Sequence, residues 1–285
     1  MTTQHPMNLQ DALASVQRQP APDASKRIER LDAKILTIDI ERVPGMALLF
    51  DPRVRSGYIQ PSSFTEEPAT ICAAFKWYGR SKVEFTSVWG DGYNTMIQRL
   101  WDAYDQADIV VTYNGKRFDN KCLNTDWLTA GLPEPSPRKD VDLLQQVRKK
   151  FQFNSYRLDE VCAALGVTRK TGKYNPREAI ACIQGDTKAQ ARMARYNRGD
   201  VRATEALYDR VRGWMHTHPH VSGLPADATG EPPTCNQCGS LDLTREGTYL
   251  ASVIAYAAYR CNNCGANTRA GHHHRQAHSR GVGPT

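Results

Sequence analysis

The sequence lacks any apolar run that approaches the ~18 residues needed to cross a membrane. Its first thirty residues are polar and contain no hydrophobic signal core, so we expect a flexible leader at 1–30 and a cytoplasmic protein. Internal repeats are also absent. Acidic residues are in the minority, with 30 Asp and Glu against 37 Lys and Arg, and the net charge of +7 favours a polyanionic partner.

The eight cysteines do not have the spacing of a disulfide framework. Four of them are scattered singly among apolar residues, which is typical of buried, unreactive thiols: Cys72, Cys122, Cys162 and Cys182. The other four form two Cys-x-x-Cys pairs with 22 residues between the pairs: Cys235 with Cys238, and Cys261 with Cys264. Such pairs are typical of metal ligands in a reducing compartment.

A glycine follows each pair, and together the pairs predict a zinc ribbon over residues 234–270. A module of this length cannot bury enough apolar surface to fold alone, so zinc would supply its stability. Four thiolates leave no open coordination position, which makes the predicted zinc ion structural. Its partner stays open: Arg245, Arg260 and Arg269 suit nucleic acid, and a protein partner is the alternative.

Upstream of the ribbon, the pattern of apolar residues predicts an α/β domain with a mixed sheet at 31–221. A linker follows at 222–233 by composition, long and flexible enough to keep the ribbon from bracing this domain, and a disordered tail occupies 271–285. The long connection 44–68 is expected to pack down beside a substrate groove. Strands are predicted at 33–41, 70–78, 83–88 and 108–113, and helices at 94–104, 140–150, 158–165 and 187–214.

The first strand carries two acids. Asp39 and Glu41 project from one side, while Leu36, Ile38 and Ile40 occupy the other. Two carboxylates on one buried face repel each other and are costly without a cation between them. The alternative is a strand that frays into a polar loop.

Two further acids, Asp119 and Asp200, could contribute to a cation site with Asp39 and Glu41. Asp119 follows an apolar strand and begins a helix, although a plain helix N-cap would look the same. Asp200 is the one charged member of an otherwise apolar or aromatic helical stripe, in which Tyr196 lies one turn before it. The stripe consists of Met193, Tyr196, Asp200, Ala203, Leu207, Val211 and Trp214.

Asp39-x-Glu41, Asn114-x-x-x-Phe118-Asp119 and Tyr196-x-x-x-Asp200 resemble the three motifs of the DEDD (DnaQ-like) exonuclease superfamily, in its tyrosine-bearing branch. Residues 34–270 resemble stand-alone, often phage-encoded exonucleases that have a ribonuclease-H-like fold and a C-terminal zinc ribbon. The segments Ala-Ala-Phe-Lys-Trp and Tyr-Arg-Leu-Asp-Glu-Val are further matches.

The resemblance implies a 3′→5′ exonuclease that uses two Mg²⁺ or Mn²⁺ ions. In that reading Asp39 bridges the metals, Glu41 and Asp200 hold the ion with the attacking water, Asp119 supports the second ion, and Tyr196 orients the water. Substrate contacts are expected from Asn114, Lys116 and Arg117, and for Asn114 the alternative is that it braces the loop. The expected substrate is single-stranded or frayed DNA. The alternatives are RNA, and a non-catalytic nucleic-acid-binding adaptor, which should have lost one of the acids.

Overall fold

The structure is a computed structural model that describes residues 33–50, 57–168, 172, 174–215, 217–221, 234–250 and 255–269. The predicted leader, linker and tail (1–30, 222–233 and 271–285) lie outside the described residues. Within the described ranges, no helix has the length and apolar character of a membrane span.

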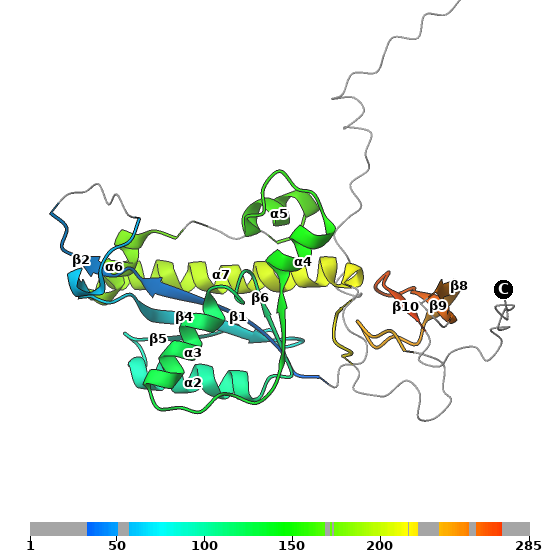
Figure 1. The fold of residues 1–285 in the computed structure, drawn as a ribbon, viewed down its shortest axis with the longest axis horizontal. Coiled ribbons are helices and arrows are strands. Elements are labelled where there is room, and N and C mark those ends of the chain that lie inside the picture. The colour runs from blue at the N-terminus through cyan, green and yellow to red at the C-terminus, as the bar shows by residue number, and fades with distance from the viewer. Residues whose placement is uncertain are drawn as a thin grey trace, which may run out of the picture.

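A five-stranded mixed sheet forms the centre of the larger domain, with the strand order β5-β4-β1-β6-β7 (Figure 1). Strand β1 is central because it pairs antiparallel with β4 on one side and parallel with β6 on the other. The strands are β1 (Ile35–Val43), β4 (Ala69–Trp77), β5 (Glu84–Ser87), β6 (Ile109–Thr112) and β7 (Lys139–Asp142). The predicted mixed α/β architecture is confirmed.

Helices cover both faces of this sheet, because β1 presents apolar side chains in both directions. Leu36, Ile38 and Ile40 pack with α2 (Tyr93–Asp105) and α3 (Asp119–Thr129). Ile35 packs on the opposite face, against the side that holds the remaining helices. These are α4 (Leu143–Lys150), α5 (Leu158–Leu165), α6 (Pro176–Ile183) and α7 (Thr187–Val211), which continues as the 3₁₀ turn η3 (Arg212–Trp214).

Two local predictions differ from the structure, and one helix was not predicted. Residues 140–142 belong to β7 and not to a helix; Asp142 then caps α4 by accepting hydrogen bonds from the backbone N–H groups of Leu144 and Gln145. The helix α6 was not predicted. At the end of the α7 stripe, Trp214 is 62% exposed and packs edge-on against Phe151 instead of entering the core.

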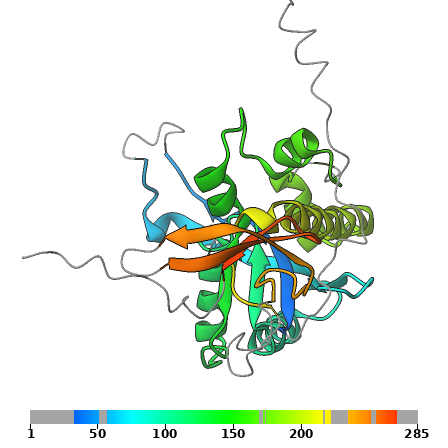
Figure 2. The same ribbon diagram turned by 90° about the vertical axis from the view of Figure 1, so that its right-hand side faces the viewer.

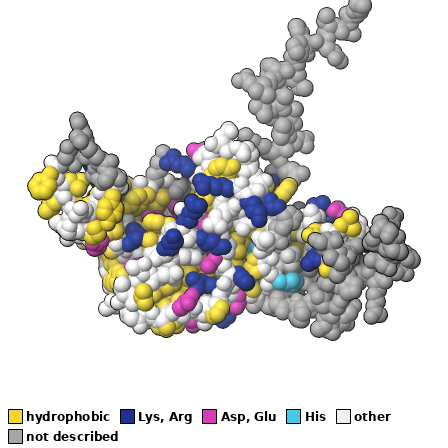
Figure 3. Space-filling view, viewed as in Figure 1, with side chains coloured by type: hydrophobic (Ala, Val, Ile, Leu, Met, Phe, Trp, Pro, Cys, Tyr) yellow, Lys and Arg dark blue, Asp and Glu magenta, His cyan; other side chains and the backbone are white. Residues whose placement is uncertain are grey.

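The connection 44–68 also differs from its prediction. It forms a small hairpin of β2 (Met46–Ala47) and β3 (Phe64–Glu66), with a 3₁₀ turn η2 (Pro61–Ser63) between them. Five of its apolar residues do not pack down, because Met46, Leu48, Leu49, Phe50 and Tyr58 are exposed, whereas Ile59 and Phe64 are half-buried. Figure 3 shows an apolar surface at the β2 end of the molecule. No other element of the described chain covers the five exposed residues.

A separate three-stranded sheet forms the cysteine module, with the order β10-β9-β8. Its strands are β8 (Leu243–Leu250), β9 (Ala255–Cys261) and β10 (Asn267–Arg269). The module lies at the C-terminal end of α7, where Figure 2 shows its strands side by side.

This cysteine module docks on the end of α7, contrary to the expectation that the linker keeps it from bracing the larger domain. Gln237 Nε2 donates a hydrogen bond of 2.8 Å to the carbonyl oxygen of Met215, and the N–H of Val221 donates to Asn236. The approach is closest at Gly213, where an added Cβ would lie 2.6 Å from the carbonyl oxygen of Cys264.

Gly213→Ala should therefore push the module away from η3. We expect the free energy of unfolding to fall by roughly 1–3 kcal/mol, the usual cost of overpacking, because the atom that the new methyl meets is rigid backbone. Chemical denaturation followed by tryptophan fluorescence measures this. Gly90→Ala is the matched control, since its Cβ would meet only the Ser87 hydroxyl, at 3.1 Å. Equal stability of the two variants would show that the contact at Gly213 is not tight.

Candidate active site

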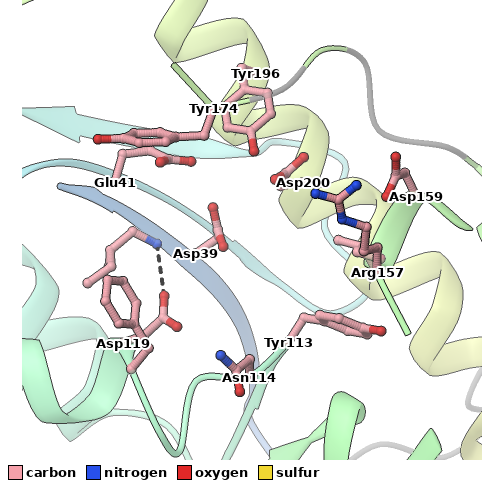
Figure 4. A pocket seen from close by; sticks show the side chains of 13 residues that line it. Asp39, Glu41, Tyr113, Asn114, Asp119, Arg157, Asp159, Tyr174, Tyr196 and Asp200 are labelled. Atoms are coloured by element: carbon pink, nitrogen blue, oxygen red, sulfur yellow. Dashed lines mark hydrogen bonds between the residues drawn. The ribbon is translucent and has the colours of Figure 1, made fainter. Parts of the chain in front are cut away.

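Three carboxylates converge where β1 passes beneath α7. Asp39 and Glu41 come from the face of β1 opposite Leu36, Ile38 and Ile40, as the strand alternation predicts. Asp200 comes from the middle of α7. One oxygen from each of these three side chains lies within 4.8 Å of the other two. Figure 4 shows the three groups directed toward one space.

Asp119 lies on the other side of this space and is held by β1 itself. Its Oδ1 accepts a hydrogen bond of 3.2 Å from the backbone N–H of Ile40, drawn as the dashed line in Figure 4. Asp119 is the first residue of α3, and the N-cap position belongs to Phe118. The alternative of a plain N-cap is therefore wrong, because the carboxylate joins α3 to the strand that carries the other two acids.

These acids line one open pocket of about 450 Å³. Of the residues predicted for the site, it brings together Asp39, Glu41, Asn114, Asp119, Tyr196 and Asp200. Lys116 and Arg117 are exposed and are not among its lining residues. The sequence analysis gave no role in the site to the other seven lining residues, which are Ile40, Tyr113, Phe118, Arg157, Leu158, Asp159 and Tyr174.

The buried side chains of Asn197 and Asp142 hold two parts of the predicted site in place. Asn197 donates from Nδ2 to the Oδ2 of Asp39 at 2.7 Å and to its carbonyl oxygen at 3.1 Å. Asp142 accepts from the backbone N–H groups of Asn114, at 2.9 Å, and Lys116, at 3.3 Å. It thereby holds the loop in which Asn114 has a φ of 72°. Asn197 could have been predicted, because it lies three residues before Asp200 on the same helix.

The electrostatics of the pocket disfavour negative charge in the absence of a cation. Burial raises the pKa of Asp39 well above its ordinary value, and the nearby carboxylates of Glu41, Asp119 and Asp200 raise it further. Burial also raises the pKa of Asp119, to about 6. The pKa of Tyr196 is raised by burial and then by Asp200, so its hydroxyl stays protonated at neutral pH. This donor set of clustered, buried carboxylate oxygens fits a hard divalent cation.

These raised values predict how stability depends on pH when chelator is present. Between the ordinary pKa of an aspartate and the value of about 6 for Asp119, the folded state holds protons that the unfolded state has released. Stability should therefore fall as pH rises through this window, and a divalent cation should reverse the fall. Melting temperatures measured with EDTA across the window, for the wild type and for Asp119→Asn, test this. An equal pH dependence in both proteins would contradict it.

The four paired cysteines form the second candidate metal centre. Their sulfur atoms all lie within 4.8 Å of one another, and the Sγ–Sγ distances are 3.6 Å for Cys235–Cys264 and 3.6 Å for Cys238–Cys261. None of these four cysteines forms a disulfide. Four sulfurs at about 2.3 Å from one tetrahedral ion would be ~3.8 Å apart, so the cluster is compatible with a zinc ribbon.

The single cysteines are Cys72, Cys162 and Cys182, which are buried as predicted, and Cys122, which is only half-buried. The Arg42 guanidinium contacts Cys122 Sγ at 2.9 Å.

Comparison with known families gives a match to the RNase H superfamily over residues 65–212, just over half of the chain. The chain belongs to the RNase H superfamily. The matched range contains Asp119, Tyr196 and Asp200, while β1 with Asp39 and Glu41 precedes it. RNase H-like nucleases use divalent metals, and this member of the superfamily has the acidic cluster that such ions require.

Curated protein sequences give no significant match to this RNase H superfamily member. Among solved structures, it is similar to the family B DNA polymerase from the hyperthermophilic archaeon Pyrobaculum calidifontis, with 20% sequence identity and a TM-score of 0.49. That similarity covers 64% of this chain and 25% of the polymerase chain.

Proposed function

We propose that this protein is a 3′→5′ exonuclease that hydrolyses phosphodiester bonds of single-stranded or frayed DNA with two Mg²⁺ or Mn²⁺ ions. The observation that carries the proposal is the convergence of Asp39, Glu41 and Asp200 within 4.8 Å, in a pocket that Asp119 and Tyr196 also line. The resemblance of the three sequence motifs to tyrosine-bearing DEDD exonucleases supports the direction and the substrate.

The position of each side chain supports the role that we propose for it. The carboxylates of Asp39, Glu41, Asp119 and Asp200 would hold the divalent ions, which supply positive charge to the attacking and leaving oxygens of the phosphodiester. Tyr196 lies one helical turn from Asp200 and interacts with its carboxylate. Its protonated hydroxyl is suited to orienting a water molecule beside the acids, rather than to acting as a phenolate base. For the ribbon, we propose one structural zinc ion.

The rim of the pocket suits a nucleic-acid strand. Among the described residues that line the pocket, Arg157 is the only Lys or Arg, and Figure 4 shows its guanidinium directed to the side where Asp200 lies. Phe118 and Tyr174 are exposed aromatic residues of the same pocket, with 48% and 38% of their surface accessible, and can stack on a terminal base. Lys and Arg side chains also gather on the face of the molecule shown in Figure 3.

Arg157→Ala tests the proposed phosphate contact. A charge-assisted hydrogen bond is worth roughly 1.5–3 kcal/mol, so we expect KM for a short oligonucleotide to rise about 10- to 100-fold. The loss in kcat should be smaller, because Arg157 is not one of the proposed metal ligands. Steady-state kinetics measures both. Arg148→Ala is the matched control, since Arg148 stacks on Tyr156 and is not a lining residue. A KM equal to that of the control would remove Arg157 from the substrate site.

The activity itself is tested with oligonucleotides labelled at the 3′ or the 5′ end. With Mg²⁺ or Mn²⁺, the proposal expects a 3′ label to be released at once as a mononucleotide and a 5′ label to give a descending ladder; with EDTA, no cleavage is expected. Matched DNA and RNA strands decide between the two substrates. Binding without any cleavage would instead support the non-catalytic adaptor, although this chain keeps all four acids and the tyrosine.

A further inference from the structure

One face of the cysteine module carries two tyrosines and an arginine. The strand register places Tyr249 of β8 directly opposite Tyr256 of β9, and Arg269 of β10 opposite Ala258. Tyr256 and Ala258 are two residues apart on one strand, so these side chains share a face of the sheet. We name the set of Tyr249, Tyr256 and Arg269 the ribbon platform.

The three side chains of the ribbon platform are stacked on one another. The ring centroids of Tyr249 and Tyr256 are 6.5 Å apart, and the Arg269 guanidinium carbon lies 4.1 Å from the Tyr256 centroid and 5.4 Å from that of Tyr249. Arginine on an aromatic ring keeps its charge, and its N–H groups remain at the edge of the stack. The platform is accessible, because Tyr249 is 52% exposed and Arg269 is also exposed.

Small residues lie beside the ribbon platform on this face. Ala258 pairs with Gly247, so neither residue of this pair places a large side chain next to the platform. The acids of the described part of the module are engaged elsewhere: Glu246 pairs with Arg260 at 2.9 Å, and Asp242 accepts a hydrogen bond from Asn262. Among the ion pairs of the described residues, none neutralises Arg269.

We propose that the ribbon platform is a second binding site for nucleic acid, which takes single strands without sequence preference. Bases would stack on the tyrosines and Arg269 would contact a phosphate, because aromatic rings interleaved with positive charge are the usual means of holding unpaired strands. The proposal rests on the proposed function in one respect, namely that the same strand enters the acidic pocket.

The docking of the module on α7 fixes the position of the ribbon platform relative to the acidic pocket, and this affects how long strands bind. The contacts at Gly213, Met215 and Val221 hold the platform at a set position relative to the pocket. A strand long enough to reach both sites therefore gains affinity from a second, intramolecular contact, whereas a short strand occupies one site at a time.

The test measures binding of full-length, zinc-loaded protein to fluorescent oligothymidylates of about 6 and about 30 nucleotides, because the longer strand is the better able to bridge two sites. The background is Asp39→Asn, so that the strands are not cleaved. Stacking contributes roughly 1–3 kcal/mol per base, so we expect Tyr249→Ala to weaken binding of the long strand about 5- to 100-fold and to leave the short strand unchanged. Tyr249→Phe should retain the affinity.

Arg269→Ala and Arg245→Ala form the matched pair, because they remove the same charge from opposite faces of the sheet. Arg245 pairs with Tyr259, whose side chain alternates away from the platform. We expect only Arg269→Ala to weaken the long strand and to lower its salt slope by about 0.7. Zinc content measured for each variant establishes that the module is folded.

Equal effects of the two arginine variants would mean unspecific charge attraction and would overturn the proposal. An unchanged affinity of Tyr249→Ala for the long strand would also overturn it. Either result would favour a protein partner for this face. Because binding is measured without cleavage, the outcome is separate from that of the exonuclease assay.

Discussion

Asp39→Asn should lower the rate of phosphodiester hydrolysis by about 10³-fold or more, with Asp200→Asn similarly affected. Removing one ligand of a catalytic metal costs several kcal/mol of transition-state stabilisation, and each ~1.4 kcal/mol is a factor of ten in rate. The measurement is single-turnover cleavage of a labelled oligonucleotide with saturating Mg²⁺ or Mn²⁺. Full activity in either variant would refute the metal assignment.

The same Asp39→Asn variant should be more stable than the wild type when metal is removed. A variant that loses activity but gains stability has lost a metal ligand, whereas a damaged fold would lose both. Burial, and then the repulsion from Glu41, Asp119 and Asp200, raise the pKa of Asp39, and a neutral amide avoids both costs of a buried charge. It can still accept the hydrogen bond from Asn197. Thermal unfolding in EDTA measures the gain, and added Mg²⁺ or Mn²⁺ should stabilise the wild type more than the variant.

Tyr196→Phe should lower kcat by roughly 10²-fold or more, since a group that orients or deprotonates a reacting water contributes about 10²–10⁴-fold. Phenylalanine keeps the half-buried ring in contact with its core neighbours and removes only the hydroxyl beside Asp200. Oligonucleotide affinity should stay near that of the wild type. Initial rates at saturating substrate, with binding measured separately, test both expectations.

Tyr174→Phe is the control for that experiment. Tyr174 lines the same pocket, but its hydroxyl donates a hydrogen bond to the carbonyl oxygen of Arg42. A loss of kcat below about threefold in Tyr196→Phe would assign Tyr196 to packing alone, because a lost water-orienting group costs far more.

Three of the four acids could be predicted from their physical cost. Asp39 and Glu41 lie on the same face of one buried strand, where two carboxylates repel each other, and Asp200 interrupts an apolar helical stripe. Asp119 was suggested by its place between an apolar strand and a helix. The rim of the pocket has no such signal. Arg157 and Tyr174 are partly or fully exposed residues, and what brings them to the site is the long-range packing of α5 and of the segment before α6.

The fold could be predicted where the sequence of an element carries a regular apolar pattern. Elements with a long apolar period, such as β1, α2 and α7, match their predicted ranges closely. The short strand β7 was missed because Asp140 and Asp142 leave it almost no apolar signal. The docking of the cysteine module could not be predicted at all, because it depends on backbone carbonyls and on the space left by Gly213.

The end of α7 has one further consequence. Arg212 is buried there and pairs with Asp209 at 2.7 Å and with the Tyr78 hydroxyl at 3.2 Å, so the helix is anchored to the sheet independently of the ribbon. If the cysteine module holds the proposed zinc ion and then loses it, fraying should therefore stop at Arg212, about three turns short of Asp200. Scarcity of zinc would then expose cleavable chain to cellular proteases while leaving turnover intact. Zinc supply would govern how long each molecule lasts, and not how fast it works.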